Sequence, residues 1–313
     1  MKIPSDILKR CWFLAGPTAC GKSASGLILA DTIGAEIVSL DSMALFRGMD
    51  IGTAKPSSAE RAQVPHHLID VALPSDDFSV ADYFDAACQA CEDIVERGRI
   101  PLFVGGTGLY LRAILRGVFD GPPADWDLRK SLEQLPPESL WGKLNEQDPV
   151  AAEKLHPNDT RRLIRAIEVI TTTGKLLSEQ QRQDPLPEDE RPRNIFWLHP
   201  DRDWLYDRIN QRVKTMVDDG LVEEVRRLLG AQPPISRTAR QGLGYKEMIK
   251  HLEKECTLSQ ATEMIQTRTR QFAKRQHTWF RNLEECRAID IGRPQSTSEI
   301  VSSIMDVADT EAR

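Results

Sequence analysis

The chain has 313 residues, of which 40% are hydrophobic and 28% charged, and its formal net charge at pH 7 is −6. These values exclude a largely disordered chain and predict a globular protein with one large or two medium domains. No stretch approaches the ~18 consecutive apolar residues of a membrane span, so we expect a cytoplasmic protein with no membrane partner. The negative net charge weighs mildly against a nucleic-acid partner, although a local cluster of cations can outweigh an average.

Four short apolar segments predict strands at residues 11–15, 36–40, 100–104 and 194–198, and helical periodicity follows each of them. Continuous apolar strands that alternate with helices are typical of a parallel sheet covered on both faces. We therefore predict an α/β fold of the P-loop type. In such sheets ligands bind beyond the carboxyl ends of the strands.

Residues 121–192 contain no strand signal and show the periodicity of short helices separated by Pro and Gly. We predict that they form an inserted, all-helical domain. The core domain then comprises residues 1–120 and 193–290. The last residues, 291–313, are polar and rich in serine, so we expect them to form a loosely ordered tail.

The first strand leads into a glycine-rich loop, Gly16-x-x-x-x-Gly21-Lys22-Ser23, which opens a helix. This order is the context of a phosphate-binding P-loop. Backbone N–H groups and the helix dipole would face the anion, Lys22 adds a full charge, and the Ser23 hydroxyl can bind Mg²⁺. The motif leaves open whether the anion is the tail of a nucleotide or a departing diphosphate.

Asp41 directly follows the second strand and is therefore expected at the same edge of the sheet as the P-loop. It could hold a metal ion, or act as a general base toward an incoming nucleophile. The structural alternative is a cap on the following turn. Thr107 follows the third strand, in Gly-Gly-Thr-Gly, and reaches the same crevice or caps the next helix.

Residues 265–287 predict a helix with one buried face and one cationic face. The two faces comprise Ile265, Phe272, Gln276, Trp279, Phe280 and Leu283 on the apolar side, and Arg270, Lys274, His277 and Arg281 on the other. A cationic face can be merely solvated, but a second cluster occurs in the insertion, at Arg161, Arg162 and Arg165. Two separate basic surfaces favour a large polyanion as partner.

Two further motifs are interpreted as structural. Cys88 and Cys91 form a CxxC inside an amphipathic helix, without a second pair of metal ligands. His66 and His67 are adjacent in an extended segment and would point to opposite faces, which makes a poor metal pair.

Taken together, these motifs resemble the tRNA dimethylallyltransferases of bacterial type, also called tRNA isopentenyltransferases. The matching segments, in chain order, are GPTACGKS, DSMALFRGMDIGTAKP, PHHLIDV, FVGGTGLYLRAIL, HPNDTRRLIRAIEV, GLVEEVRRL, QGLGYKEM and KRQHTWFR. The resemblance implies that the loop holds the pyrophosphate of dimethylallyl diphosphate with Mg²⁺. It also implies transfer of the dimethylallyl group to N6 of adenosine 37, next to the anticodon of tRNAs that read codons beginning with U.

The same resemblance implies the roles of individual residues. Asp41 would accept the proton from N6, with Thr107 beside it as a second catalytic residue. The implied diphosphate-binding residues are Gly16, Pro17, Thr18, Ala19, Cys20, Gly21, Lys22, Ser23 and Arg212, with Ser23 as the metal ligand. Arg208, one helical turn before Arg212, stays open as the alternative arginine.

The resemblance also implies contacts with the anticodon stem-loop of tRNA, and the insertion would serve as a clamp on the stem. The implied tRNA-binding residues are Asp41, Ser42, Met43, Ala44, Thr107, Arg129, Arg161, Arg162, Leu163, Ile164, Arg165, Gln241, Gly242, Leu243, Gly244, Tyr245, Lys246, Lys274, Arg275, Gln276, His277, Thr278, Trp279, Phe280 and Arg281.

Three other functions compete with this interpretation. A small-molecule kinase would use the same loop but would leave both basic surfaces without a role. A non-catalytic RNA-binding protein would have no need of an intact Gly, Lys, Ser and Asp set. A transferase acting on free adenine nucleotides shares the chemistry but needs only a few cations, so the basic surfaces favour RNA. We expect the protein to be a monomer.

Overall fold

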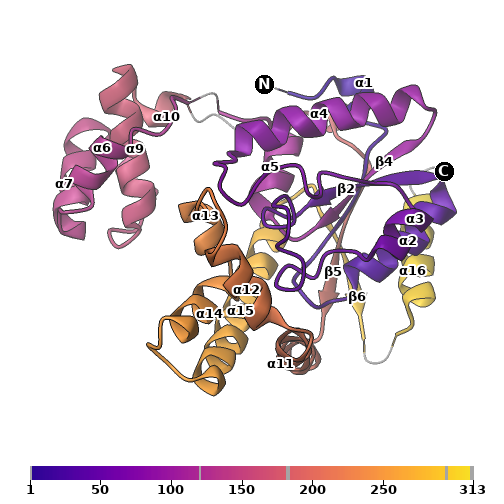
Figure 1. Cartoon of the computed structure of the whole chain (residues 1–313). Coiled ribbons are helices and arrows are strands. Elements are labelled where there is room, and N and C mark those ends of the chain that lie inside the picture. Colours follow the sequence, from indigo (N-terminus) through magenta and orange to yellow (C-terminus); the bar gives the residue numbers. More distant parts are fainter. Residues whose placement is uncertain (1, 120, 181–183, 293–294, 311–313) are drawn as a thin grey trace. The chain divides into compact units, whose positions relative to one another are not determined.

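The computed structural model describes residues 2–119, 121–180, 184–292 and 295–310 (Figure 1). The chain divides into two compact units: Arg116–Pro185 form the inserted unit, and Ile3–Leu115 with Leu186–Arg313 form the core unit. Compared with the predicted range 121–192, the insertion begins and ends a few residues earlier. Among the described residues, no helix is both long and apolar enough to cross a membrane.

The core unit is built on a parallel sheet with six strands among the described residues, in the order β3-β2-β4-β1-β5-β6. The strands are β1 (Trp12–Ala15), β2 (Ala35–Leu40), β3 (His66–His67), β4 (Ile100–Gly105), β5 (Asn194–Pro200) and β6 (Arg287–Ile291). The predicted α/β fold is confirmed, and the four predicted strands correspond to β1, β2, β4 and β5. The two additional strands lie at the edges of the sheet.

Helices cover both faces of this sheet (Figure 1). The helices that flank it are α1 (Ser5–Leu8), α2 (Lys22–Ile33), α3 (Ser58–Gln63), α4 (Val80–Glu96), α5 (Gly108–Arg116) and α16 (Thr297–Thr310). The connection through α2 and the connection through α4 run in opposite directions across the sheet, so the right-handed crossover rule puts them on opposite faces. Every residue of β2 is buried, as expected for a strand covered on both sides.

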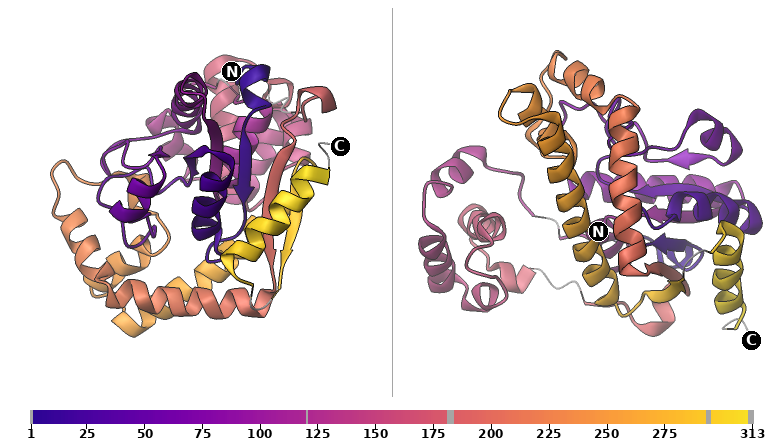
Figure 2. Two further views of the ribbon diagram at one scale, coloured as in Figure 1. Left: turned by 90° about the vertical axis from the view of Figure 1, so that its right-hand side faces the viewer. Right: turned by 90° about the horizontal axis from the view of Figure 1, so that it is seen from below.

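A second group of helices follows β5. The short 3₁₀ turn η1 (Glu188–Glu190) lies just before that strand. The group comprises α11 (Arg202–Asp218), α12 (Leu221–Leu229), α13 (Arg237–Arg240), α14 (Tyr245–Leu252) and α15 (Leu258–Arg281). These helices bury an apolar cluster that includes Val213, Val225, Met248 and Ile265, together with Phe46 and Met49 from the loop after β2. Helix α15 packs against both α11 and α14, and Figure 2 shows α11 and α15 side by side.

The predicted loose tail, residues 291–313, is wrong for the part that the structure describes. Ile291 ends β6, and α16 buries Ile300, Val301 and Ile304 against α2. Two features of this serine-rich segment favour a helix. Its apolar residues recur at a helical spacing, and Ser296 exchanges hydrogen bonds with Glu299 as in a capping box. Residues 293, 294 and 311–313 of the predicted tail lie outside the described residues.

The described part of the inserted unit is helical, as the sequence predicts. Its helices are α6 (Trp126–Leu132), α7 (Pro137–Gln147), α8 (Pro149–Glu153), α9 (Thr160–Thr173) and α10 (Leu177–Gln180). The Asp159 side chain caps α9 by accepting from the Arg162 N–H, and Gly174 ends this helix in a left-handed conformation. Leu140, Leu144 and Ile167 contribute to a core that belongs to this unit alone.

A buried carboxylate joins α6 to α9 within this core. Glu168 is fully buried and accepts two hydrogen bonds from Arg129, at 2.8 Å each, one from Arg165 at 2.6 Å and one from the Asp125 N–H at 2.7 Å. Burial raises the pKa of the Glu168 carboxyl, but the hydrogen bonds from Arg129, Arg165 and Asp125 outweigh burial and lower the pKa overall. The ionised form is therefore the one that stabilises the unit.

We expect Glu168→Ala to destabilise the inserted unit by about 3–5 kcal/mol, because it leaves two arginines without their buried partner. Hydrogen exchange of the amides in α6 and α9 measures this local opening. Because the folded-state pKa is lowered, the stability from Glu168 is present above the unfolded pKa and is lost as the pH falls through the folded one. Unchanged exchange rates would contradict the prediction, and the exposed Glu146→Ala on α7 serves as control.

Candidate active site at the carboxyl edge of the sheet

Four loops meet at one edge of the sheet because four neighbouring strands end there. Ala15 pairs with Gly105 on one side and with Trp197 on the other, and Leu40 also pairs with Gly105. The residues that follow these strand positions are consequently neighbours in space. This register brings the P-loop, Asp41 and the Gly-Gly-Thr-Gly loop together, as parallel strand order requires.

The P-loop has the backbone of a phosphate-binding loop. Gly16, Ala19 and Gly21 all have positive φ angles, of 148°, 65° and 100°. A side chain at position 16 would place its Cβ 3.1 Å from the carbonyl oxygen of Leu198, so glycine is required there. Helix α2 begins at Lys22 without a side-chain cap and without an acidic residue in its first turn. Its free N–H groups can therefore receive an anion.

Lys22 and Arg212 give this loop its positive charge. The Lys22 Nζ donates to the carbonyl oxygen of Pro17 at 2.6 Å, so the ammonium lies over the loop. Burial lowers the pKa of Lys22, the charge of Arg212 lowers it further, and the charge of Asp41 raises it. For Arg212 on α11, burial lowers the pKa and the charge of Asp41 raises it. Both cations thus lie within electrostatic reach of Asp41.

Arg212 and its alternative, Arg208, have different contacts in the structure. Arg208 donates through Nε to the carbonyl oxygen of Ala19 at 2.9 Å, and its guanidinium lies 4.9 Å from the Trp204 ring centroid. Arg208 therefore braces the P-loop through its backbone. Arg212 instead shares the surroundings of Lys22 and Asp41, which favours it as the arginine that binds an anion.

We expect Arg212→Met to weaken pyrophosphate binding by roughly 10- to 100-fold, the effect of losing one charge-assisted hydrogen bond. Arg208→Met should have a smaller effect, because the loop keeps its other contacts. Isothermal titration with magnesium pyrophosphate measures both variants. A larger loss in Arg208→Met than in Arg212→Met would reverse the assignment.

Asp41 caps a turn and still has one carboxylate oxygen to offer. Its Oδ1 accepts from the N–H groups of Met43 at 2.8 Å and Ala44 at 3.2 Å. Within the described part of the chain, no hydrogen bond or ion pair engages Oδ2. Asp41 can therefore cap the turn through Oδ1 and still act as a base or a metal ligand through Oδ2, so the two interpretations are compatible.

Thr107 lies beside Asp41 because the two loops are bonded together. The Thr107 Oγ1 accepts from the Ser42 N–H at 3.1 Å, and the Gly106 and Thr107 N–H groups donate to the carbonyl oxygen of Leu40. A Cβ at Gly105 would lie 2.4 Å from that oxygen, which explains why glycine occupies this position. The Thr107 hydroxyl keeps its own hydrogen to donate.

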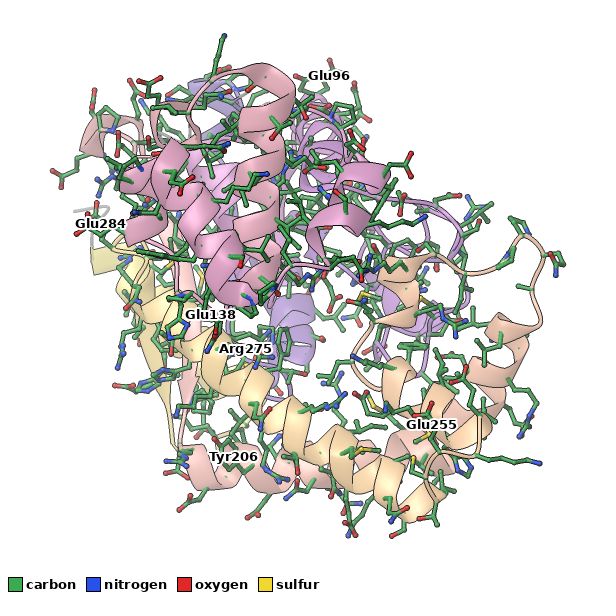
Figure 3. All side chains as sticks on the ribbon, turned by 90° about the vertical axis from the view of Figure 1, so that its left-hand side faces the viewer. Glu96, Glu138, Tyr206, Glu255, Arg275 and Glu284 are labelled. Carbon is green, nitrogen blue, oxygen red and sulfur yellow. The ribbon has the colours of Figure 1, made fainter. Side chains whose placement is uncertain are left out.

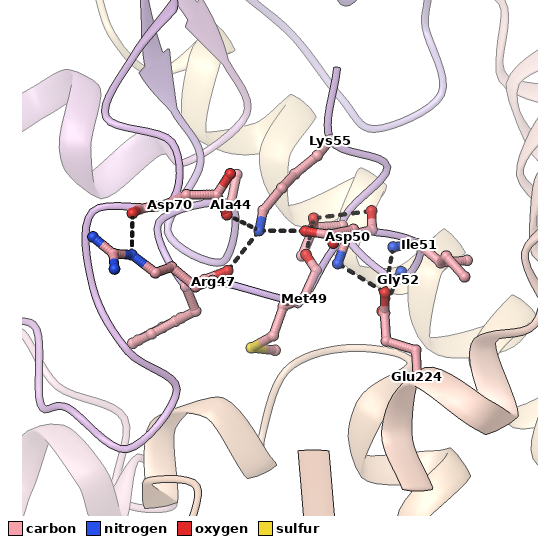
Figure 4. A network of polar contacts seen from close by, with 12 residues as sticks. Ala44, Arg47, Met49, Asp50, Ile51, Gly52, Lys55, Asp70 and Glu224 are labelled. Atoms are coloured by element: carbon pink, nitrogen blue, oxygen red, sulfur yellow. Dashed lines mark hydrogen bonds and ion pairs between the residues drawn. The ribbon is translucent and has the colours of Figure 1, made fainter. Parts of the chain in front are cut away.

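The loop that follows Asp41 is anchored to α12 by a buried acid that the sequence analysis missed. Glu224 accepts from the N–H groups of Asp50, Ile51 and Gly52 at 2.9, 2.8 and 3.1 Å, and from the Tyr245 hydroxyl at 2.7 Å. Figure 4 shows the three backbone contacts. The sequence did contain a signal for this anchor: an acidic residue on the same helical face as Leu221, Val225 and Leu228.

Lys55 provides the second anchor of this loop. Its side chain is 2% exposed, and its Nζ donates to the carbonyl oxygen of Phe46 at 2.6 Å and to Asp50 and Asp70 at 2.8 and 2.6 Å (Figure 4). Arg61 also bonds Asp70, at 2.8 Å. This network, together with Glu224, fixes the shape of the loop after Asp41 and does not involve the Asp41 carboxylate.

Only part of the predicted cationic face of α15 is exposed. Lys274 and Arg281 are exposed, whereas Arg270 is half-buried and donates to Asn210 Oδ1 and to the Thr267 hydroxyl. Arg275 and Thr278 are exposed as well, and we call Lys274, Arg275 and Arg281 the basic stripe. Figure 3 labels Arg275 on this helix, with Glu255 before it and Glu284 beyond its end. His277 is half-buried, with its ring 5.0 Å from Trp197 and 4.8 Å from His199; burial, then the charges of His199 and Arg281, lowers its pKa.

Several residues implied to bind tRNA have side chains that serve the protein interior instead. Gln276 and Phe280 of α15 are buried, and Trp279 packs against Gly108. The others are Ala44, Leu163, Ile164 and Tyr245, which are buried, and Arg129 and Arg165, which bind Glu168. These contiguous segments include the opposite, buried faces of helices, so only part of each segment can present a side chain to RNA.

Four of the remaining implied contacts outside α15 have exposed side chains, whereas Gly242 and Gly244 are buried. Arg161 and Arg162 are exposed on α9, and Gln241 and Lys246 are exposed around the turn before α14. Gly242 in that turn lies against Met43, since a Cβ there would be 2.8 Å from the methyl carbon of Met43. The turn is thus packed on the loop that carries Asp41.

The CxxC pair lies on a helix, as the sequence suggests. Both cysteines lie on α4, Cys91 is buried, and burial raises the pKa of the Cys88 thiol to about 12. In the described ranges no group of three or more His, Cys, Asp or Glu residues could hold a metal ion.

A parallel sheet with a lysine-bearing glycine loop at its carboxyl edge defines a P-loop type of α/β protein. Residues 44–283 match the IPP transferase family. The chain is 46% identical over 286 residues to the tRNA dimethylallyltransferase of Pelotomaculum thermopropionicum, covering 89% of this chain and 90% of that protein. It is 44% identical over 300 residues to the enzyme of the same name from Geobacter metallireducens, covering 95% and 96%. The chain belongs to the IPP transferase family.

Solved structures agree with this membership. The tRNA isopentenylpyrophosphate transferase of Bacillus halodurans is 38% identical, with a TM-score of 0.67 over 97% of this chain and 100% of that one. A eukaryotic dimethylallyltransferase acting on tRNA is 27% identical, with a TM-score of 0.75 over 96% of this chain and 77% of that one.

Proposed function

We infer that this protein is a tRNA dimethylallyltransferase, which transfers the dimethylallyl group of dimethylallyl diphosphate to N6 of adenosine 37 beside the anticodon. The observation that carries the inference is that Asp41, with Oδ2 unengaged by described groups, lies at the same edge of the sheet as the Lys22 loop. Family membership supports the type of group transferred. Its substrates would be tRNAs that read codons beginning with U, and the enzyme would act as a cytoplasmic monomer.

The loop would bind the diphosphate as a leaving group. Amide groups at the start of α2, the Lys22 ammonium and the Arg212 guanidinium supply positive charge where the departing oxygens gain negative charge. Thr18 would contribute its hydroxyl, because its amide is already bonded to Gln276 at 2.9 Å.

The residues at this loop fit a magnesium ion. The exposed hydroxyl of Ser23, in the first turn of α2, offers one oxygen ligand beside the loop. Mg²⁺ usually takes few protein ligands and completes its shell with water and phosphate oxygens, so one hydroxyl is sufficient. When bound, the ion would neutralise part of the diphosphate charge.

The transfer itself needs a base for the nucleophile. The N6–C bond forms as the C–O bond to the diphosphate breaks, and Asp41 accepts the proton that N6 loses. Thr107, held against the Asp41 loop through Ser42, would orient the amine. Pyrophosphate leaves, and Asp41 returns its proton to water. Since adenosine 37 must reach the sheet edge, the base has to leave the anticodon-loop stack.

The exposed cations would hold the tRNA. The basic stripe lies on the helix whose buried face contacts both the P-loop and the Gly106 loop, so tRNA phosphates would be bound next to the reacting groups. Arg161 and Arg162 of the inserted unit add a second basic surface.

Mass analysis of nucleosides tests the proposal directly. Unmodified tRNA incubated with protein, Mg²⁺ and dimethylallyl diphosphate should yield dimethylallyl adenosine and pyrophosphate. A parallel incubation with labelled ATP and with free AMP separates the alternatives. Phosphoryl transfer from ATP would favour a kinase, and prenylation of AMP but not tRNA would favour a nucleotide-modifying enzyme.

A further inference from the structure

Gln276 joins two of the loops that carry the site, the P-loop and the Gly106 loop, although it lies on the helix of the basic stripe. Its Oε1 accepts from the Thr18 N–H at 2.9 Å, and its Nε2 donates to the Gly106 carbonyl oxygen at 2.7 Å. The residue is only 5% exposed. A Cβ at Gly106 would lie 2.2 Å from Nε2, so the amide is fitted closely between the loops.

This contact uses one of the amides that a P-loop would offer to an anion. Thr18 lies at the strand end of the loop, and the N–H groups at the start of α2 lie at its other end. The Lys22 ammonium lies near Thr18, since its Nζ donates to the carbonyl oxygen of Pro17 at 2.6 Å. An anion that extends from the start of α2 past the Lys22 ammonium would therefore reach Thr18. There it would meet an occupied backbone amide and the side-chain Oε1 of Gln276, which repels phosphate oxygens.

We propose that Gln276 determines the length of polyphosphate that the loop accepts, by closing its strand end so that a diphosphate fits and a triphosphate does not. The proposal rests on the proposed function, in which a diphosphate is the substrate group. It also gives a physical reason why a P-loop in this chain need not bind a nucleoside triphosphate. Gln276 is a specificity-determining residue that acts on the ligand from the tRNA-facing helix.

Isothermal titration with inorganic magnesium pyrophosphate and magnesium tripolyphosphate tests this without the transfer reaction. The wild type should prefer pyrophosphate, and Gln276→Ala should reduce the ratio of the two affinities by about tenfold or more, since it frees one amide for a charged acceptor. Gln266→Ala is a matched control, because Gln266 lies on the same helix but donates to the Asn210 carbonyl oxygen on α11. It should leave the ratio unchanged.

Gln276→Ser provides a second small variant should the alanine variant fold poorly, and the same reduced ratio is expected. An equal loss of both affinities would overturn the proposal, because Gln276 would then only shape the loop; so would an unchanged ratio in a folded variant. If the wild type prefers pyrophosphate but prenylates no tRNA, the proposed function fails while this inference stands.

Discussion

Asp41→Asn is expected to lower kcat for dimethylallyl transfer by about 10²- to 10⁴-fold, the usual contribution of a positioned general base. The asparagine retains an Oδ1 that can accept from the Met43 and Ala44 N–H groups, so the turn keeps its cap. The substitution replaces Oδ2 with an amide nitrogen, which cannot accept a proton. Single-turnover measurement of prenylated tRNA gives the rate without product release.

Binding measurements separate this catalytic role from a structural one. Asp41 lies near Lys22 and Arg212, so removing its negative charge should leave pyrophosphate affinity unchanged or raise it. Asp41→Ala is the control for the cap and should cost an additional 0.5–2 kcal/mol or so in stability. An asparagine variant that keeps more than about a tenth of the wild-type rate would exclude Asp41 as the base.

Three residues of the candidate site could be located from the sequence because each lies in a loop that directly follows a strand. Lys22, Asp41 and Thr107 follow apolar segments that form β1, β2 and β4, and parallel strands end at one edge. This inference needs no knowledge of contacts between the loops, because neighbouring parallel strands bring the loops together. The pattern of apolar segments was therefore sufficient to place these three residues at one edge of the sheet.

The residues that support the site could not be predicted in this way. Glu224 binds backbone N–H groups 172 to 174 residues away, and Gln276 binds the Thr18 amide 258 residues away. Sequence periodicity places each of them on a buried helical face but does not identify a partner. A polar side chain on an apolar face must find a hydrogen bond inside the protein. That rule points to such residues as anchors, whereas the neighbourhood of Gln276 in the sequence suggests tRNA contacts.

Neutralising the basic stripe, with Lys274, Arg275 and Arg281 each replaced by Gln, is expected to weaken tRNA binding by about tenfold or more at low salt. All three side chains are exposed, and the described structure assigns none of them an ion pair with a carboxylate. Each phosphate contact that is lost should reduce the slope of log K against log salt by roughly 0.7–0.9, so three contacts reduce it by about 2–3. Filter binding across a salt series gives this slope.

Diphosphate binding provides the internal control for the stripe, because Gln276, which contacts the P-loop from the same helix, stays in place. Pyrophosphate affinity should therefore be unchanged in the triple variant. A charge-matched control replaces Arg226, Lys250 and Lys254, which lie on α12, on α14 and just after α14. If both triple variants changed the salt slope equally, the effect would come from net charge alone. The stripe would then have no specific part in holding tRNA phosphates beside the active site.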